Sequence, residues 1–148
     1  MAVFAVNKKA NFDYEILETY EAGLRLFGHE VKSIIHNTVN LAGTFVVIRG
    51  KEAYILNLHI PPYQPGNMPK SYEEKRTVKL LLKKKELLRL IGLSQQKGLT
   101  LIPIKLYNKN RNLKIEFGVA KHKKLHDKRE TMAKRDAERN IDRAMKEY

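Results

Sequence analysis

The side chains of this sequence that could do chemistry are mainly lysine and arginine, and that chemistry is the attraction of phosphate. The 148-residue chain carries 29 Lys and Arg against 16 Asp and Glu, a net charge of +13. One basic cluster is usually only a solvated surface. Three in a chain of this size favour a surface that follows a nucleic-acid backbone. The clusters are Asn7-Lys8-Lys9; Lys75, Arg76, Lys79, Lys83, Lys84 and Lys85; and Lys121, Lys123, Lys124, Lys128 and Arg129.

Other chemistries find little support in the sequence. His122 and His126 have the i, i+4 spacing that places two imidazoles on one helix face, but Lys123 and Lys124 between them would repel a metal ion. The chain has no cysteine, which excludes thiol catalysis, disulfides and cysteine-ligated zinc. There is no Gly-rich phosphate loop followed by Lys-Ser/Thr and no nucleophile elbow. We therefore expect no enzyme, no metal and no cofactor.

The last 28 residues, 121–148, form a basic tail without glycine or proline. The tail holds ten Lys and Arg against six Asp and Glu. Drawn as a helix, its apolar residues make one narrow stripe, too thin for a stable helix in water. The stripe consists of Ala133, Ala137, Ile141, Ala144, Met145 and Tyr148. We expect the tail to become helical when it binds a partner; the alternative is a helix packed on its own domain.

Alternating apolar and polar residues predict strands in the preceding part of the chain. The predicted strands are 12–20, 44–48, 53–60, 99–107 and 113–120. Turn residues at 49–52 and 108–112 predict two hairpins. Pro103 lies inside the fourth strand, which indicates an edge position or a bulge. Tyrosines in and near these strands could stack on bases, although a half-buried strand position is the preferred reading for Tyr54. They are Tyr14, Tyr20, Tyr54, Tyr63, Tyr72 and Tyr107.

Two helices are expected to interrupt the strands. Val31, Ile34 and Ile35 make an apolar stripe within 28–36, and a second stripe lies within 83–96, with Gly98 just beyond its end. Four of the five prolines fall between Ile60 and Lys75, which predicts a long surface loop there.

Together these patterns predict a mainly β fold with short helices. We expect an antiparallel barrel resembling an OB fold over residues 1–120 and a separate basic tail over 121–148. No apolar run approaches the ~20 residues that would span a bilayer, and the first residues do not have the pattern of a signal peptide. We expect a cytoplasmic protein that does not bind membranes and is a monomer.

Four segments together resemble one known family, small protein B, the SsrA (tmRNA)-binding proteins. The segments are NKKANFDYEI from Asn7, EAGLRLFGHEVKSI at 21–34, TVKLLLKKKEL from Thr77, and FGVAKHKKLHDKRET at 117–131. The resemblance runs in order from Asn7 to the C-terminus. It implies an oligonucleotide-binding barrel whose partners are tmRNA, the small ribosomal subunit and its 16S rRNA, acting in ribosome rescue by trans-translation.

The resemblance also implies roles for particular residues. Residues in the family's barrel motifs would face the tRNA-like domain of tmRNA; they are Asn7, Lys8, Lys9, Glu21, Glu30, Lys32 and Leu81. The basic cluster adds phosphate contacts from Lys79, Lys83 and Lys84. Residues of the tail opening would face the decoding centre; they are Lys121, Lys123, Lys124, His126, Asp127, Lys128 and Arg129. His122 stands where members usually have glycine, which would permit positive φ.

Three classes of function follow from these observations. The first is a non-catalytic RNA-binding adaptor for tmRNA. The second is a general RNA-binding or ribosome-associated structural protein built on an OB-like barrel. The third, an RNA-processing enzyme, would require an acid/base or metal pair that the sequence does not offer.

Overall fold

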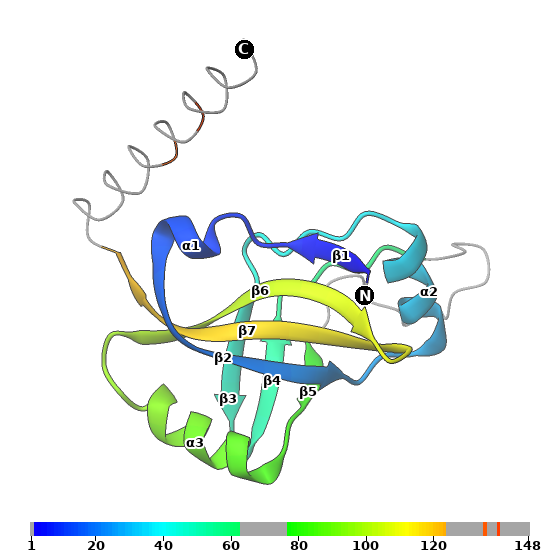
Figure 1. The fold of residues 1–148 in the computed structure, drawn as a ribbon. Coiled ribbons are helices and arrows are strands. Elements are labelled where there is room, and N and C mark those ends of the chain that lie inside the picture. The colour runs from blue at the N-terminus through cyan, green and yellow to red at the C-terminus, as the bar shows by residue number, and fades with distance from the viewer. Residues whose placement is uncertain (1, 63–76, 124–134, 136–138, 140–148) are drawn as a thin grey trace.

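Antiparallel strands make up most of the fold, and Figure 1 shows them with the helices at the ends of the sheet. The computed structural model describes residues 2–62, 77–123, 135 and 139. The strands are β1 (Val3–Val6), β2 (Tyr14–Leu24), β3 (Phe45–Arg49), β4 (Glu52–Leu56), β5 (Val78–Leu81), β6 (Leu99–Lys109) and β7 (Asn112–His122). The helices are α1 (Ala10–Asp13), α2 (Gly28–His36) and α3 (Lys84–Ser94).

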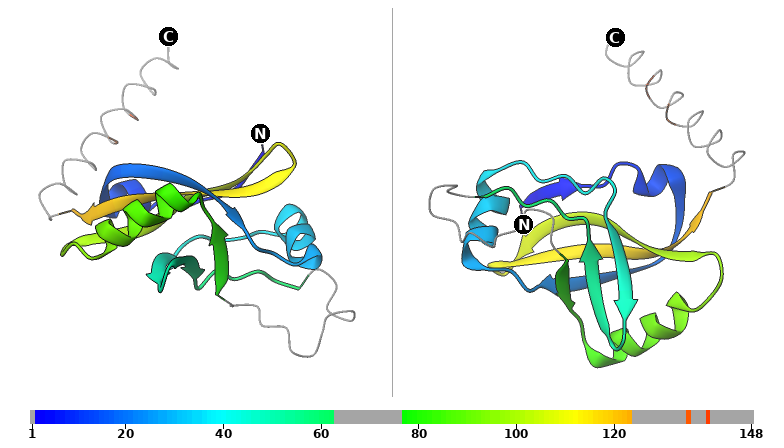
Figure 2. Two further views of the ribbon diagram at one scale, coloured as in Figure 1. Left: turned by 90° about the horizontal axis from the view of Figure 1, so that it is seen from below. Right: turned by 180° about the vertical axis from the view of Figure 1, so that it is seen from behind.

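Six of the strands close into a barrel. Their order is β6-β3-β4-β5-β2-β7, and β7 pairs again with β6. The long strands β2, β7 and β6 run side by side, as Figures 1 and 2 show. β3 meets β6 at only one register pair, Val46 with Leu101, and β1 adds to β6 farther along. The predicted small antiparallel barrel with short helices is therefore confirmed.

The barrel interior is filled by alternate residues of these strands. Ile55, Val78, Leu106, Ile115 and Phe117 are all completely buried there. In β5, Val78 and Leu80 point inward while Lys79 and Leu81 lie on the outside. Because side chains alternate along a strand, one face of each strand is buried in the core and the other lies on the outside of the barrel.

A second, smaller core lies outside the barrel, under α1. Ala10 of α1 packs on Ile102 and Ala120, with Ile16 and Ile104 at its margin. Gly118 lies close to this cluster, and a Cβ added there would come within 2.8 Å of the Ile16 Cγ2 atom. The close approach of the β2, β7 and β6 side chains over Gly118 therefore requires glycine.

Several sequence predictions are corrected by the fold. β1, α1 and β5 were not predicted, and β2 continues to Leu24, beyond the predicted end at Tyr20. β4 ends at Leu56, before the predicted end at Ile60. α2 has the predicted bounds, whereas α3 is shorter than 83–96 at both ends. Most of the predicted Pro-rich loop lies outside the described residues.

Pro103 shows how a proline is accommodated in the middle of this sheet. The register between β6 and β7 shifts between Pro103 and Lys105, so the predicted bulge is present. β6 is not an edge strand, because it pairs with β7 on one side and with β1 and β3 on the other; no register pair of β1 or β3 includes Pro103 itself.

Candidate nucleic-acid interface

Glu21 lies on the outer surface of β2, held by two residues of β6. The buried Tyr107 hydroxyl donates a hydrogen bond to Glu21 Oε2, and the Lys109 ammonium lies 3.6 Å from Oε1. The Tyr107 hydrogen bond holds the pKa of Glu21 below its ordinary value, and Lys109 adds to this effect. Burial, followed by the same hydrogen bond, raises the pKa of Tyr107. Glu21 is thus a fixed anion in a basic surface.

A second pair continues this pattern across β7. Glu116 is the register partner of both Glu21 on β2 and Lys105 on β6. The Lys105 ammonium lies 3.4 Å from Glu116 Oε2 and 5.2 Å from the Tyr107 ring centroid. We call Glu21, Lys105, Tyr107, Lys109 and Glu116 the paired face. Its cations are already neutralised by carboxylates, so it offers a patterned surface rather than a purely positive one.

Leu81 and Lys79 extend this surface onto β5. Leu81 is the register partner of Gly23 and is 51% exposed. A Cβ at Gly23 would lie 3.3 Å from the Leu81 Cβ, so glycine lets the leucine lie across β2. The Lys79 ammonium lies 2.9 Å from a Glu52 carboxylate oxygen. Lys79 is therefore partly neutralised within the fold.

The basic box Asn7-Lys8-Lys9 follows β1 and is anchored by its asparagine. Asn7 is half-buried, and its Nδ2 donates to the Pro103 carbonyl at 2.9 Å, while its backbone N–H donates to Ile104 at 2.7 Å. Asn7 therefore fastens the box to the bulge of β6. Lys8 and Lys9 are exposed, and neither forms an ion pair within the described part of the chain.

Lys83 and Lys84 are exposed at the beginning of α3. Lys83 is the N-cap residue, and Glu86 Oε1 accepts its backbone N–H at 3.4 Å. Lysines at a helix N-terminus oppose the helix dipole, so they do not favour the helix itself. Neither forms an ion pair with a described residue, which leaves both ammonium groups to an external anion.

Glu30 requires a correction. It was expected on the RNA-facing surface, but its side chain is completely buried. Its Oε1 accepts the Phe27 backbone N–H at 2.9 Å, which caps the N-terminus of α2. Glu30 is therefore a structural residue, whereas Lys32, one turn from the cap, is exposed.

The beginning of the tail continues β7. Lys121 is exposed and pairs in register with Glu15 and Leu99. His122 is not among the residues with positive φ, and its ring packs edge-on against Tyr14 at 5.0 Å. The Lys123 backbone N–H donates to the Asp13 carbonyl at 2.8 Å, and its Nζ donates to the Asn11 carbonyl. The strand thus passes the predicted domain boundary at 120, with His122 in place of the glycine that family members usually have there.

The other tail residues assigned to the decoding centre lie outside the described residues. They are Lys124, His126, Asp127, Lys128 and Arg129. One described tail residue, Arg135, places its guanidinium carbon 5.7 Å from the Phe12 ring centroid of α1. This cation–π contact links Arg135 to α1.

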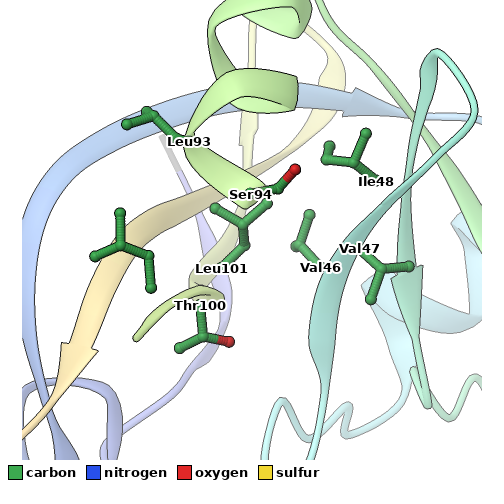
Figure 3. Close-up of a pocket in the computed structure, with 8 residues that line it drawn as sticks. Val46, Val47, Ile48, Leu93, Ser94, Thr100 and Leu101 are labelled. Carbon is green, nitrogen blue, oxygen red and sulfur yellow. The ribbon is translucent and has the colours of Figure 1, made fainter. Parts of the chain in front are cut away.

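Two hollows lined by described residues lie near these elements. Figure 3 shows one of them, between the end of α3 and strands β3 and β6 where these pair only once; its volume is about 260 Å³. The other, about 310 Å³, is lined by Val6, Asn7, Lys8, Lys9, Asn40 and Ala42, and we call it the box hollow. Of these two hollows, the box hollow is the one that contains residues assigned to RNA from the sequence.

The described residues contain no group of three or more His, Cys, Asp or Glu placed to hold a metal ion. None of the helices in the described part is long and apolar enough to cross a membrane.

Sequence reasoning missed several members of this surface. It treated Tyr107 as a possible stacking ring, but Tyr107 is only 3% exposed and its hydroxyl donates a hydrogen bond to Glu21. It also did not identify Lys105, Lys109 or Glu116. Their alternation on β6 and β7 marked them as outward-facing, but only the register between the strands places them beside Glu21. Tyr54, in contrast, is half-buried as predicted.

A small closed barrel with lysines and fixed carboxylates on its outer surface defines a class of basic, β-barrel binding proteins. The sequence pattern of the SmpB protein family matches residues 4–147. The chain belongs to this family.

Related proteins match this chain over almost its whole length. The chain is 52% identical to the SsrA-binding protein of Carboxydothermus hydrogenoformans, covering 97% of this chain and 96% of the relative. It is 50% identical to that of Gloeothece citriformis, covering 96% and 92%. It is also similar to a solved chain described as "tmRNA-SmpB: a journey to the center of the bacterial ribosome", with a TM-score of 0.66, 46% identity, and coverage of 81% and 84%.

Proposed function

We propose that this protein is a non-catalytic RNA-binding adaptor that binds the tRNA-like domain of tmRNA and delivers it to stalled ribosomes for trans-translation. The observation that carries the proposal is the match to SsrA-binding proteins over nearly the full chain. Unpaired lysines at 8, 9, 83 and 84 supply the positive charge that RNA phosphates require. The proposed location is the cytoplasm, where its ribosomal partner works, and the proposed state is a monomer.

The adaptor has two tasks that fall to different parts of the chain. The barrel binds RNA, through cations that the fold leaves unpaired and through the patterned paired face. The tail then acts at the decoding centre of the small subunit, near 16S rRNA. In this division the carboxylates have a role: each one repels a misplaced phosphate, so a bound RNA is oriented as well as attracted.

The test is the affinity for a transcript of the tRNA-like domain of tmRNA, compared with bulk tRNA at physiological salt. An adaptor should prefer the tRNA-like domain by at least about a hundredfold, roughly 2.7 kcal/mol. Equal affinity for both would contradict the proposal. It would favour the general RNA-binding alternative, whose attraction is mainly electrostatic.

The division of labour is tested by truncation after Lys123. This position is chosen because β7 extends to His122 and Lys123 is hydrogen-bonded to α1. The truncated protein should bind the tRNA-like domain within about tenfold of the full chain, roughly 1.4 kcal/mol. The matched full-length variant replaces His126, Asp127 and Lys128 with alanine. It should bind RNA normally yet fail to tag stalled chains in a reconstituted translation reaction.

A further inference from the structure

The box hollow brings together two segments that are distant in the sequence. One wall is the basic box after β1, and the other is the segment that joins α2 to β3. Figures 1 and 2 show this segment passing beside β1. Its volume of about 310 Å³ falls at the lower end of the roughly 300–1,000 Å³ typical of small-ligand sites.

The lining of the hollow has three kinds of group. Lys8 and Lys9 line the hollow, and their ammonium groups form no ion pair with described residues. Val6 contributes an apolar side chain that is 55% exposed. Asn40 contributes an exposed amide. Cations, an apolar surface and an amide together match the phosphate, the ring and the polar edge of one nucleotide.

Asn40 is held in place by its own backbone. Its Oδ1 accepts the Ala42 N–H at 2.8 Å, which uses the acceptor end of the amide. Among the described residues, no acceptor is hydrogen-bonded to its Nδ2. The amide therefore presents donors in a fixed orientation, and it would bind an acceptor such as a base carbonyl or a ribose oxygen. On the opposite wall, Asn7 is committed to Pro103 and anchors the lysines.

We propose that this hollow is a subsite for a single RNA nucleotide, with its phosphate between Lys8 and Lys9 and an acceptor of its base or ribose on Asn40 Nδ2. The inference deepens the proposed function, because it adds the α2–β3 segment to the RNA-binding surface. It assigns to Asn40 the contact with the base or ribose, and to the two lysines the contact that holds the backbone of the nucleotide.

The direct test is an NMR titration of the ¹⁵N-labelled full chain with UMP, AMP and inorganic phosphate. The nucleotides should shift the amides of Lys8, Lys9, Asn40 and Ala42 in a saturable way, and phosphate alone should shift only the lysines. In Asn40→Asp the nucleotide shifts should be lost; the aspartate keeps an acceptor for the Ala42 N–H, so the turn is preserved. Equal shifts from phosphate and nucleotide, or shifts unchanged in Asn40→Asp, would overturn the subsite.

The second measurement uses the transcript of the tRNA-like domain. Asn40→Asp should weaken its binding by about tenfold, because a donor is lost and a negative charge faces phosphate. Gln95→Glu is the matched control, since it makes the same amide-to-carboxylate change beyond the end of α3; it should change affinity less than about twofold. Equal effects of the two variants would contradict the subsite. The mononucleotide titration decides the subsite even if the chain shows no preference for the tRNA-like domain.

Discussion

On the paired face, lysines lie beside carboxylates; in the basic box after β1, they do not. Lys105 and Lys109 face Glu116 and Glu21, at 3.4 Å and 3.6 Å. Lys8 and Lys9 form no ion pair with a described residue. A count of charges treats these four lysines as equal, although only Lys8 and Lys9 offer their full charge to phosphate. The barrel therefore separates attraction, in the box, from orientation, on the paired face.

The largest expected effect comes from removing the unpaired cations. The double variant Lys8→Ala/Lys9→Ala should lower RNA affinity by about 30-fold at ~0.15 M salt, because each released counterion contributes roughly fivefold there. The slope of log K against log salt should become shallower by about two. Filter binding or fluorescence anisotropy over a salt series measures both. An unchanged slope would show that the box is only a solvated surface.

The second prediction compares two lysines of one basic cluster, one unpaired and one in an ion pair. Lys83→Ala should weaken binding by about fivefold, whereas Lys79→Ala should change it less than about twofold. The reason is that Lys79 is already paired with Glu52 at 2.9 Å. Anisotropy with the tRNA-like-domain transcript compares the two variants directly. A larger loss in Lys79→Ala would contradict the importance of prior pairing.

A smaller effect, on stability, tests the hydrogen bond between Tyr107 and Glu21 on the paired face. Tyr107→Phe removes the hydroxyl that donates to Glu21 and should reduce the free energy of unfolding by about 1 kcal/mol at pH 7. The pKa of Glu21 is lowered in the folded protein, so this stabilisation is present above the unfolded pKa of about 4.3 and is lost as pH falls through the folded value. Urea unfolding at pH 7 and pH 3 should show the gap between wild type and variant closing.

The gap in stability would stay constant with pH if Tyr107 acted through packing alone. Phenylalanine keeps the aromatic ring and its packing, so the variant and the wild type differ only in the hydroxyl group.

The smallest effect comes from relieving one pair. Glu52→Gln should raise RNA affinity by less than about twofold, because it returns charge to a partly exposed Lys79. The gain should disappear in the Glu52→Gln/Lys79→Ala double variant. A double-mutant cycle on RNA affinity measures this coupling. A gain that persists in the double variant would mean that Glu52 repels RNA on its own account.

The predictable parts of the fold are those whose patterns are local. The apolar stripe of α2 and the alternation of β7 were sufficient to place both elements. β1 was missed because it is only four residues long and its burial does not alternate: Val3 and Val6 are 47% and 55% exposed, whereas the adjacent Phe4 and Ala5 are half-buried against the core. The end of β2 was missed because Gly23 resembles a strand break, although it is the place where Leu81 crosses.

For the candidate site, residue types were predictable but pairings were not. Lys8, Lys9, Lys83 and Lys84 were identified from their clustering, and the structure leaves them exposed. Glu30 was placed on the RNA-facing surface because it matches a family motif, and a motif match does not show whether a carboxylate faces solvent or caps its own helix. The partners of Glu21 come from residues 107 and 109, and no local pattern encodes a contact across 86 residues.

The pairing of β2 with β7 has a consequence for folding during synthesis on the ribosome. Gly23 pairs with Lys114 and Tyr14 with His122, so β2 has no β7 partner until about ninety further residues have been made. At roughly 5–20 residues per second, β2 waits about 5–20 seconds. During this time its hydrogen-bonding edge is open to other chains. The barrel cannot close gradually as it is synthesised, and we expect it to form in one late step, once residue 122 is free to join the sheet.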